Sequence, residues 1–171
     1  YDGERFGAVY TEKKVAYGAN VFTARGREEL TRIVFYEYHP FTSPEYRVDI
    51  YKLDSADAAP SSGQLVSSVS VEQRVFPYKE GYTTVELPSP IKVFEGDVFS
   101  VVLRAEVKTE DYAVIPREPF LASTAPNSSY VRRDGKDWKQ DNRDLCIKAM
   151  TKTRPECAHS FADGAIPAAC T

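Results

Sequence analysis

The segment Glu45–Leu53 runs EYRVDIYKL, and its alternation of apolar with polar residues is typical of a β-strand. Successive side chains of a β-strand point to opposite faces, so this pattern predicts a strand with one face in a core and the other toward solvent. The apolar face consists of Tyr46, Val48 and Ile50. The opposite face consists of Arg47, Asp49 and Tyr51.

Similar strand-like segments continue along the chain, separated by turn residues such as those of Pro60–Gly63 and Glu95–Asp97. The other predicted strands are Gly18–Ala24, Leu30–Tyr38, Gln64–Glu72, Gly81–Leu87, Asp97–Ala105, Ser128–Arg133, Lys136–Lys139 and Asp144–Met150. Their apolar positions predict a core that contains Phe35, Val48, Ile50, Val85, Phe99, Val101, Leu103 and Ile147. Many short strands with frequent turns predict an all-β fold, an antiparallel two-sheet β-sandwich.

The dipeptide Asp134-Gly135 favours a two-residue type I′ hairpin. In that register Arg132 faces Asp137 as an ion pair, and Val131 faces Trp138. The pairing with Val131 predicts that Trp138 belongs to the core.

Length and charge restrict the kinds of partner. The chain has 171 residues and a net charge of −3, with 22 Lys+Arg against 25 Asp+Glu. This mixture provides no basic field for a phosphate backbone, so we expect no nucleic acid partner. No apolar run approaches the roughly 20 residues that span a bilayer, so we expect no membrane insertion.

The C-terminal part differs from the rest. Residues 1–151 carry the strand pattern, whereas residues 152–171 are rich in Ala and Pro and predict a tail or linker. Cys157 and Cys170 can close a loop in this tail. A disulfide there agrees with an extracellular or cell-surface location, because disulfides persist in oxidising compartments. The alternative is that Cys146, Cys157 and Cys170 are three unrelated thiols.

Catalytic patterns are weak. The two histidines are His39, which precedes a proline at a predicted strand end, and His159 in the tail. Neither stands in a convincing nucleophile–base arrangement. We therefore expect a non-catalytic module, with an independent hydrolase as the remote alternative.

Exposed aromatic residues are the candidates for ligand binding. Tyr51 shares a strand face with Arg47 and Asp49, and the further candidates are Tyr78, Tyr82, Tyr112, Tyr130 and Trp138. Aromatic rings can pack on the C–H surface of a sugar while polar neighbours hydrogen-bond its hydroxyl groups. The alternative is that these are ordinary surface tyrosines, which need no function.

An ordered set of segments resembles the lectin-like domain that accompanies papain-family cysteine proteases of anaerobic and gut bacteria. The segments are Asn20–Ala24, Tyr46–Tyr51, Gly81–Leu87, Glu95–Val102, Ser129–Tyr130, Asp134–Gly135 with Trp138, and Leu145–Ala149. The resemblance implies a jelly-roll, lectin-like sandwich that is secreted or wall-attached and lies beside a protease domain. Because the catalytic cysteine of such proteins lies in the protease domain, it also implies that Cys146 is not a nucleophile.

A calcium site is a further expectation. A jelly-roll brings its early strands and its last strand together at one end, which can gather Asn20, Glu28 and Asp144. Oxygen ligands suit Ca²⁺, whereas Zn²⁺ prefers Cys and His. The alternative is that Glu28 begins a turn and Asp144 points into water.

Together these features predict an accessory module of a secreted or cell-surface bacterial protein. Its expected partners are the neighbouring domains of the parent chain, among them a cysteine protease, and a glycan or cell-wall polymer. The alternative is a structural spacer without a soluble ligand.

Overall fold

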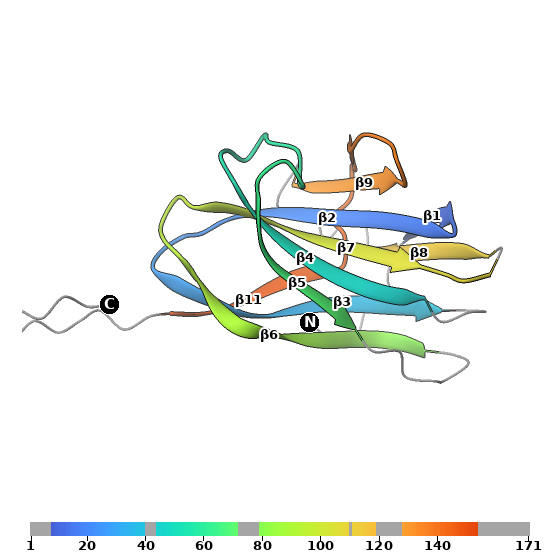
Figure 1. Ribbon diagram of the computed structural model, residues 1–171, viewed down its shortest axis with the longest axis horizontal. Coiled ribbons are helices and arrows are strands. Elements are labelled where there is room, and N and C mark those ends of the chain that lie inside the picture. The colour runs from blue at the N-terminus through green and yellow to red at the C-terminus, as the bar shows by residue number, and fades with distance from the viewer. Residues whose placement is uncertain (1–7, 40–43, 72–78, 110, 119–127, 154–171) are drawn as a thin grey trace, which may run out of the picture.

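The computed structural model describes residues 8–39, 44–71, 79–109, 111–118 and 128–153. These residues form strands and connecting turns (Figure 1). The strands are β1 (Ala8–Lys13), β2 (Val15–Thr23), β3 (Glu28–His39), β4 (Glu45–Leu53), β5 (Gln64–Val71), β6 (Lys79–Val93), β7 (Val98–Glu106), β8 (Tyr112–Arg117), β9 (Ser129–Arg133), β10 (Lys139–Gln140) and β11 (Ile147–Thr153). Within this described part no helix is long and apolar enough to span a membrane.

Two layers make the predicted antiparallel sandwich. One layer is a six-stranded sheet of order β10-β9-β2-β7-β4-β5. The facing layer contains the three-stranded sheet β11-β3-β6 and the β1–β8 pair. Residues 144–146 join these two parts, because the Cys146 N–H donates to the Pro116 carbonyl (3.0 Å) and the Tyr36 N–H donates to the Cys146 carbonyl (3.0 Å).

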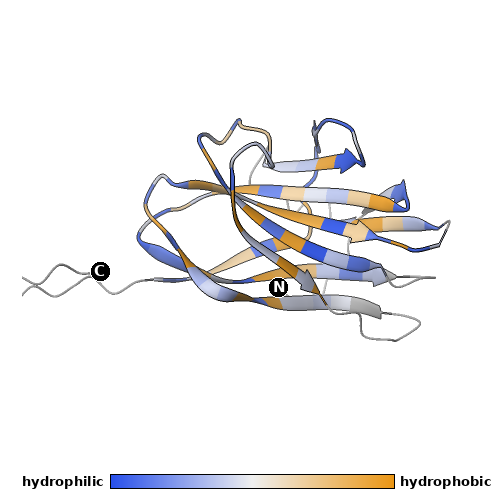
Figure 2. Cartoon of the chain, viewed as in Figure 1, coloured by the Kyte–Doolittle hydropathy of each residue, from blue (hydrophilic) through white to orange (hydrophobic). Residues whose placement is uncertain are grey.

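The core lies between the layers, and the eight core residues predicted from the strand alternation are all buried there. Phe35, Val48 and Val101 have no exposed surface, and Phe35 packs on Tyr46 across the layers with ring centroids 4.9 Å apart. Figure 2 shows the alternation that produces this core as bands along β4. The predicted core and the two-sheet fold are confirmed.

The first strand changes layer at a sharp corner. Lys14 separates β1 from β2 and has a φ of 66°, in the left-handed region that non-glycine residues seldom adopt. Two backbone hydrogen bonds hold this corner, from the Lys14 N–H to the Asp111 carbonyl (3.1 Å) and from the Val107 N–H to the Lys14 carbonyl (2.8 Å). Through this corner one continuous segment contributes β1 to one layer and β2 to the other.

Two strands and part of a third were not predicted. They are β1, β8 and the second half of β6. Pro116 in β8 and Pro88 and Pro90 in β6 suggest breaks in a strand, because proline cannot donate to a β-ladder. Proline is tolerated in β6 because β6 is an edge strand, and the register with β3 shifts between Leu30 and Arg32, where β6 carries its prolines.

The β9–β10 hairpin has a different register from the predicted one. Val131 faces Lys139 rather than Trp138, so the pairing is displaced by one residue. Gly135 has a φ of 64° but Asp134 does not have a positive φ, whereas a type I′ turn needs both. A displacement by one residue moves the side chains of the second strand to the opposite face relative to those of the first. Trp138 therefore lies on the outer face of the sheet, on the side of Arg132 rather than of Val131, and is only half-buried.

Gly18 of β2 lies close against side chains of the facing layer. A Cβ atom there would come within 2.7 Å of both Ile115 Cγ2 and Leu145 Cδ1. We expect Gly18→Ala to lower the free energy of unfolding by about 1–3 kcal/mol, the usual cost of overpacking. Gly26→Ala is the matched control, because no atom lies within 4 Å of that position. Urea unfolding measures both, and equal stability of the two variants would contradict the close approach.

Candidate functional site

The outer face of the six-stranded sheet carries a row of four large side chains from four adjacent strands. Tyr17 of β2 pairs with Arg104 of β7 on one side and with Arg132 of β9 on the other. Arg104 pairs in turn with Arg47 of β4. Partners directly opposite in a ladder point to the same face, so the row Arg132–Tyr17–Arg104–Arg47 crosses the sheet on its outer side.

Aromatic side chains surround this row and form a second, smaller hydrophobic cluster. Tyr51, Tyr130 and Trp138 are half-buried there against a buried floor of Val15, Tyr17, Ala19 and Val102. We define the outer-face platform as the surface formed by Tyr17, Arg47, Tyr51, Arg104, Tyr130, Arg132 and Trp138. Partly exposed rings on a packed floor are held in place, which reduces the entropy that a ligand must remove on binding.

Tyr17 fixes the centre of the platform. Its hydroxyl donates to Asp134 Oδ1 (3.2 Å) and accepts from Arg104 Nε (3.3 Å). The guanidinium of Arg132 lies 4.2 Å from the centroid of the Tyr17 ring and 4.8 Å from that of Trp138. The Tyr17 and Trp138 rings meet edge to face at 6.4 Å, so these side chains support one another.

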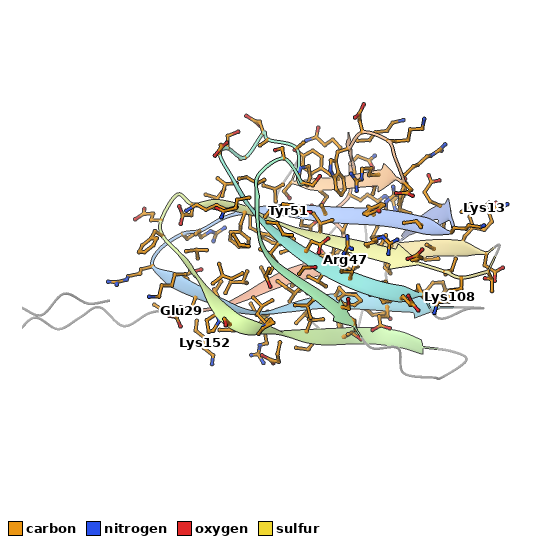
Figure 3. All side chains as sticks on the ribbon, in the orientation of Figure 1. Lys13, Glu29, Arg47, Tyr51, Lys108 and Lys152 are labelled. Atoms are coloured by element: carbon orange, nitrogen blue, oxygen red, sulfur yellow. The ribbon has the colours of Figure 1, made fainter. Side chains whose placement is uncertain are left out.

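The structure brings together three of the four residues predicted to bind a ligand. Arg47 and Tyr51 lie on the same face of β4 (Figure 3), and Asp49 lies between them on that face. Asp49 is buried and accepts hydrogen bonds from Arg47 Nε (3.0 Å) and from the Ser68 hydroxyl (2.6 Å). Burial raises the pKa of Tyr51, and the Asp49 carboxylate adds to the rise. Asp49 thus holds Arg47 in place, and Arg47 and Tyr51 remain open to a ligand.

Tyr82, the fourth predicted residue, lies in β6 of the other layer. Its ring packs edge to face on Tyr36 at 5.0 Å and lies under the Lys148 ammonium at 5.3 Å. It is 41% exposed but shares no face with Tyr51. The sequence alone does not show that Tyr82 lies apart from Tyr51, because that depends on which layer the strand of Tyr82 joins.

The loop between β4 and β5 borders the platform at one end. The Ser100 hydroxyl donates to the Pro60 carbonyl, and Trp138 Nε1 donates to Ser61 Oγ (3.0 Å). Gly63 closes the loop so tightly that a Cβ atom there would lie 1.9 Å from the Lys52 carbonyl oxygen. These contacts fix the position of Trp138 on the outer face.

Sequence reasoning missed Tyr17, Arg104 and Arg132 as members of this face. The alternation of β2 and β7 marks which side chains point outward, but only the pairing of β2 with both β7 and β9 places them in one row. Tyr130 and Trp138 were among the aromatic candidates, but the one-residue error in the hairpin register favoured the core for Trp138.

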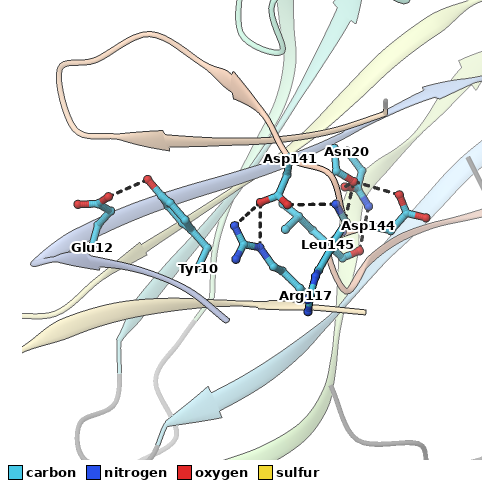
Figure 4. Close-up of polar contacts among 9 residues, drawn as sticks. Tyr10, Glu12, Asn20, Arg117, Asp141, Asp144 and Leu145 are labelled. Atoms are coloured by element: carbon cyan, nitrogen blue, oxygen red, sulfur yellow. Dashed lines mark hydrogen bonds and ion pairs between the residues drawn. The ribbon is translucent and has the colours of Figure 1, made fainter. Parts of the chain in front are cut away.

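The predicted calcium ligands are only partly brought together (Figure 4). Asn20 is buried, its Nδ2 donates to the carbonyls of Leu145 (3.0 Å) and Ile147 (2.9 Å), and its Oδ1 accepts from the Ser129 hydroxyl (2.7 Å). Asp144 Oδ1 is 3.4 Å from the same hydroxyl.

Glu28, in contrast, pairs with Thr153 at the far end of β11, six residues beyond Ile147. An extended strand of that length covers about 20 Å. The three residues therefore do not form one ligand set, and the amide of Asn20 already ties the two layers together. In the described residues no three His, Cys, Asp or Glu side chains group as metal ligands. Calcium binding stays a prediction that thermal melts with Ca²⁺ and with a chelator can test.

Cys146 is buried beside Glu118. Burial raises the pKa of its thiol from 9.0 to about 12, and the Glu118 carboxylate adds to the rise. The thiolate is the reactive form, so we expect native Cys146 to resist alkylation at pH 8 and to react after unfolding. The other two cysteines, Cys157 and Cys170, lie outside the described residues, so peptide mass analysis must identify the labelled position.

The same pKa shift predicts how stability depends on pH. The folded-state pKa of Cys146 is above its unfolded value, so the stability contributed by the neutral thiol is present below pH 9.0 and is lost as the pH rises toward about 12. Cys146→Ala should make the free energy of unfolding fall less steeply with pH in this range. Rapid labelling of native Cys146 at pH 8, or an unchanged slope, would contradict the burial of the thiol.

Comparisons with known proteins identify a family and two solved structures that share this fold. The family described as a lectin-like domain matches residues 1–151. No curated protein matches the chain in sequence. The chain is similar in structure to the cysteine protease and lectin-like domains of Cwp84, a surface layer associated protein of Clostridium difficile, with a TM-score of 0.60 and 19% identity. It is also similar to the clostridial cysteine protease Cwp84 after propeptide cleavage, with a TM-score of 0.62 and 18% identity.

These likenesses cover 82% and 86% of this chain but only 33% and 38% of the two solved chains. At such identities they show the fold. The lectin-like domain is a non-catalytic module, separate from the protease domain in Cwp84. Because the family match covers residues 1–151 of 171, this chain belongs to the lectin-like domain family.

Proposed function

We propose that this domain binds carbohydrate or cell-wall material at the bacterial cell surface through its outer-face platform, as an accessory module beside a cysteine protease domain. The observation that carries the proposal is the gathering of Tyr51, Tyr130 and Trp138 around a row of arginines on one sheet face. Family membership and the surface-layer protein that shares the fold support the location and the neighbouring domain.

The chemistry of the platform suits a sugar. Aromatic rings provide flat apolar surfaces, and the guanidinium groups beside them donate directed hydrogen bonds to hydroxyl oxygens. A few polar groups at fixed positions among apolar ones are what a small-ligand site requires for orientation. Arg47 is fixed by Asp49, and Arg104 is fixed by Glu106 Oε2 at 2.6 Å, so both present their remaining donors in set directions.

Binding to glycan arrays and to cell-wall fractions tests the proposal. We expect Tyr51→Ala to weaken binding by about tenfold or more, the effect of losing a contact worth about 1.4 kcal/mol. Tyr82→Ala is the matched control, because it removes a half-exposed tyrosine from the other layer. Circular dichroism and thermal melts must show that both variants are folded.

The outcomes separate the alternatives. Equal losses in the two variants would argue against the platform as the binding surface. Absence of binding across sugars and wall polymers would favour a structural spacer. Binding by the isolated domain that disappears when the protease domain is attached would indicate that the platform packs on that domain instead.

A further inference from the structure

A cavity opens at the edge of the sandwich next to the platform. The six-stranded sheet ends there in the short β9–β10 hairpin, and the other layer ends in β1 (Figure 4). The space between them has a volume of about 490 Å³. Tyr10 and Glu12 line it from β1, and the hairpin contributes Arg132, Arg133, Lys136 and Lys139.

The lining of this edge cavity is basic although the whole chain has a net charge of −3. It contains four cationic side chains, against the carboxylates of Glu12 and Asp137. Glu12 is already engaged, because it accepts from Arg133 Nε (2.7 Å) and from the Tyr10 hydroxyl (3.0 Å). Within the described residues, Arg132, Lys136 and Lys139 have no ion-pair partner. Cations along a concave wall raise the local concentration of anions.

Arg132 is the most constrained of these cations. Its guanidinium is stacked on Tyr17 and Trp138, and its Nε is buried without a hydrogen-bond acceptor among the described residues. The planar guanidinium matches the paired oxygens of a carboxylate or a phosphate. Stacking fixes the plane of this guanidinium before a ligand arrives. Anion binding therefore costs little conformational entropy of the Arg132 side chain.

We propose that the edge cavity is an anion subsite that receives the carboxylate or phosphate group of an acidic glycan. Arg132 belongs to both surfaces, because it is among the residues that line the cavity and its guanidinium stacks on two platform rings. The inference rests on the proposed carbohydrate binding, because the anionic group belongs to the polymer that the platform holds. It narrows the ligand class from glycans in general to acidic ones.

Calorimetric titration of the full chain with matched probes tests the subsite. The probes are trigalacturonate, its neutral methyl ester and galactose 1-phosphate. We expect the acid to bind about tenfold more tightly than the ester, since charge-assisted hydrogen bonds are about twice as strong as neutral ones. This preference should shrink between about 50 mM and about 500 mM salt, where screening shortens the reach of each charge.

Variants locate the effect. Lys136→Gln combined with Lys139→Gln should remove most of the preference and leave binding of the ester unchanged. Lys92→Gln combined with Lys152→Gln is the control, because these exposed lysines lie in β6 and β11 of the other layer. Arg132→Lys keeps the charge and loses the planar fork. Because Arg132 also belongs to the platform, this variant should weaken binding of both probes, and binding of the acid more than binding of the ester.

Each result decides between the two proposals. Acid and ester binding with equal affinity, unaffected by the lysine variants, would overturn the anion subsite and leave the carbohydrate proposal standing. Binding of galactose 1-phosphate that the lysine variants abolish would support the subsite with phosphate as its anion. Failure of all three probes to bind would overturn the subsite together with the proposed function for these sugars.

Discussion

Asn20→Asp should lower the free energy of unfolding by more than about 3 kcal/mol, because it turns two buried hydrogen bonds into repulsive contacts. The amide of Asn20 donates to the carbonyls of Leu145 and Ile147, which belong to the opposite layer. A carboxylate has no proton to donate and would place a charge against two carbonyl oxygens in a buried position. Asn20 is 7% exposed, so water cannot replace the lost donors.

Urea unfolding followed by tryptophan fluorescence and circular dichroism measures this effect. Asn142→Asp is the matched control, because it makes the same chemical change at an exposed position. We expect the control to change stability by less than about 0.5 kcal/mol. A loss of similar size in both variants would contradict the role of Asn20 as a tie between the layers.

The second large effect is expected at Asp141, which follows the β9–β10 hairpin. Its carboxylate is buried and accepts two hydrogen bonds from the guanidinium of Arg117, one of them 2.8 Å from Nε, and one from the Arg143 N–H at 3.1 Å. Asp141→Ala leaves the partly buried cation of Arg117 without this partner. Breaking a buried pair from one side costs about 3–5 kcal/mol.

A second substitution distinguishes the ion pair from simple loss of packing. Arg117→Met in the Asp141→Ala background removes the cation that has lost this carboxylate and should recover part of the lost stability. Asp137→Ala, at an exposed position of the neighbouring hairpin, should have little effect. Strict additivity of the Arg117 and Asp141 changes in a double-mutant cycle would show that the two groups are not coupled.

The fold could be predicted to the extent that each strand carries its own signal. In β4 the alternation of Tyr46, Val48 and Ile50 with polar residues defines the strand, whose bounds are the predicted ones. In β8 and the second half of β6 prolines obscure the same signal. Proline is tolerated at these positions because the strand pairing or the edge location does not require its missing N–H donor. Which positions these are depends on the order of the strands in the whole fold.

The candidate site could be predicted only along a single strand. Arg47, Asp49 and Tyr51 share a face because they alternate within β4, and the structure keeps them together. Joining them to Tyr17 and Arg132 requires the order of strands in the sheet, which local patterns do not contain. Tyr82 and Glu28 were grouped with residues of other strands, and both lie in the opposite layer.

The prolines of β6 also affect how this domain can associate with other chains. An edge strand recruits a further strand through its free N–H and carbonyl groups, and Pro88 and Pro90 remove two N–H donors from this edge. β5, the corresponding edge of the six-stranded sheet, contains neither proline nor charged residues and exposes Leu65 and Val66. We therefore expect intermolecular strand addition, and the aggregation that follows from it, at β5 rather than at the proline-containing half of β6.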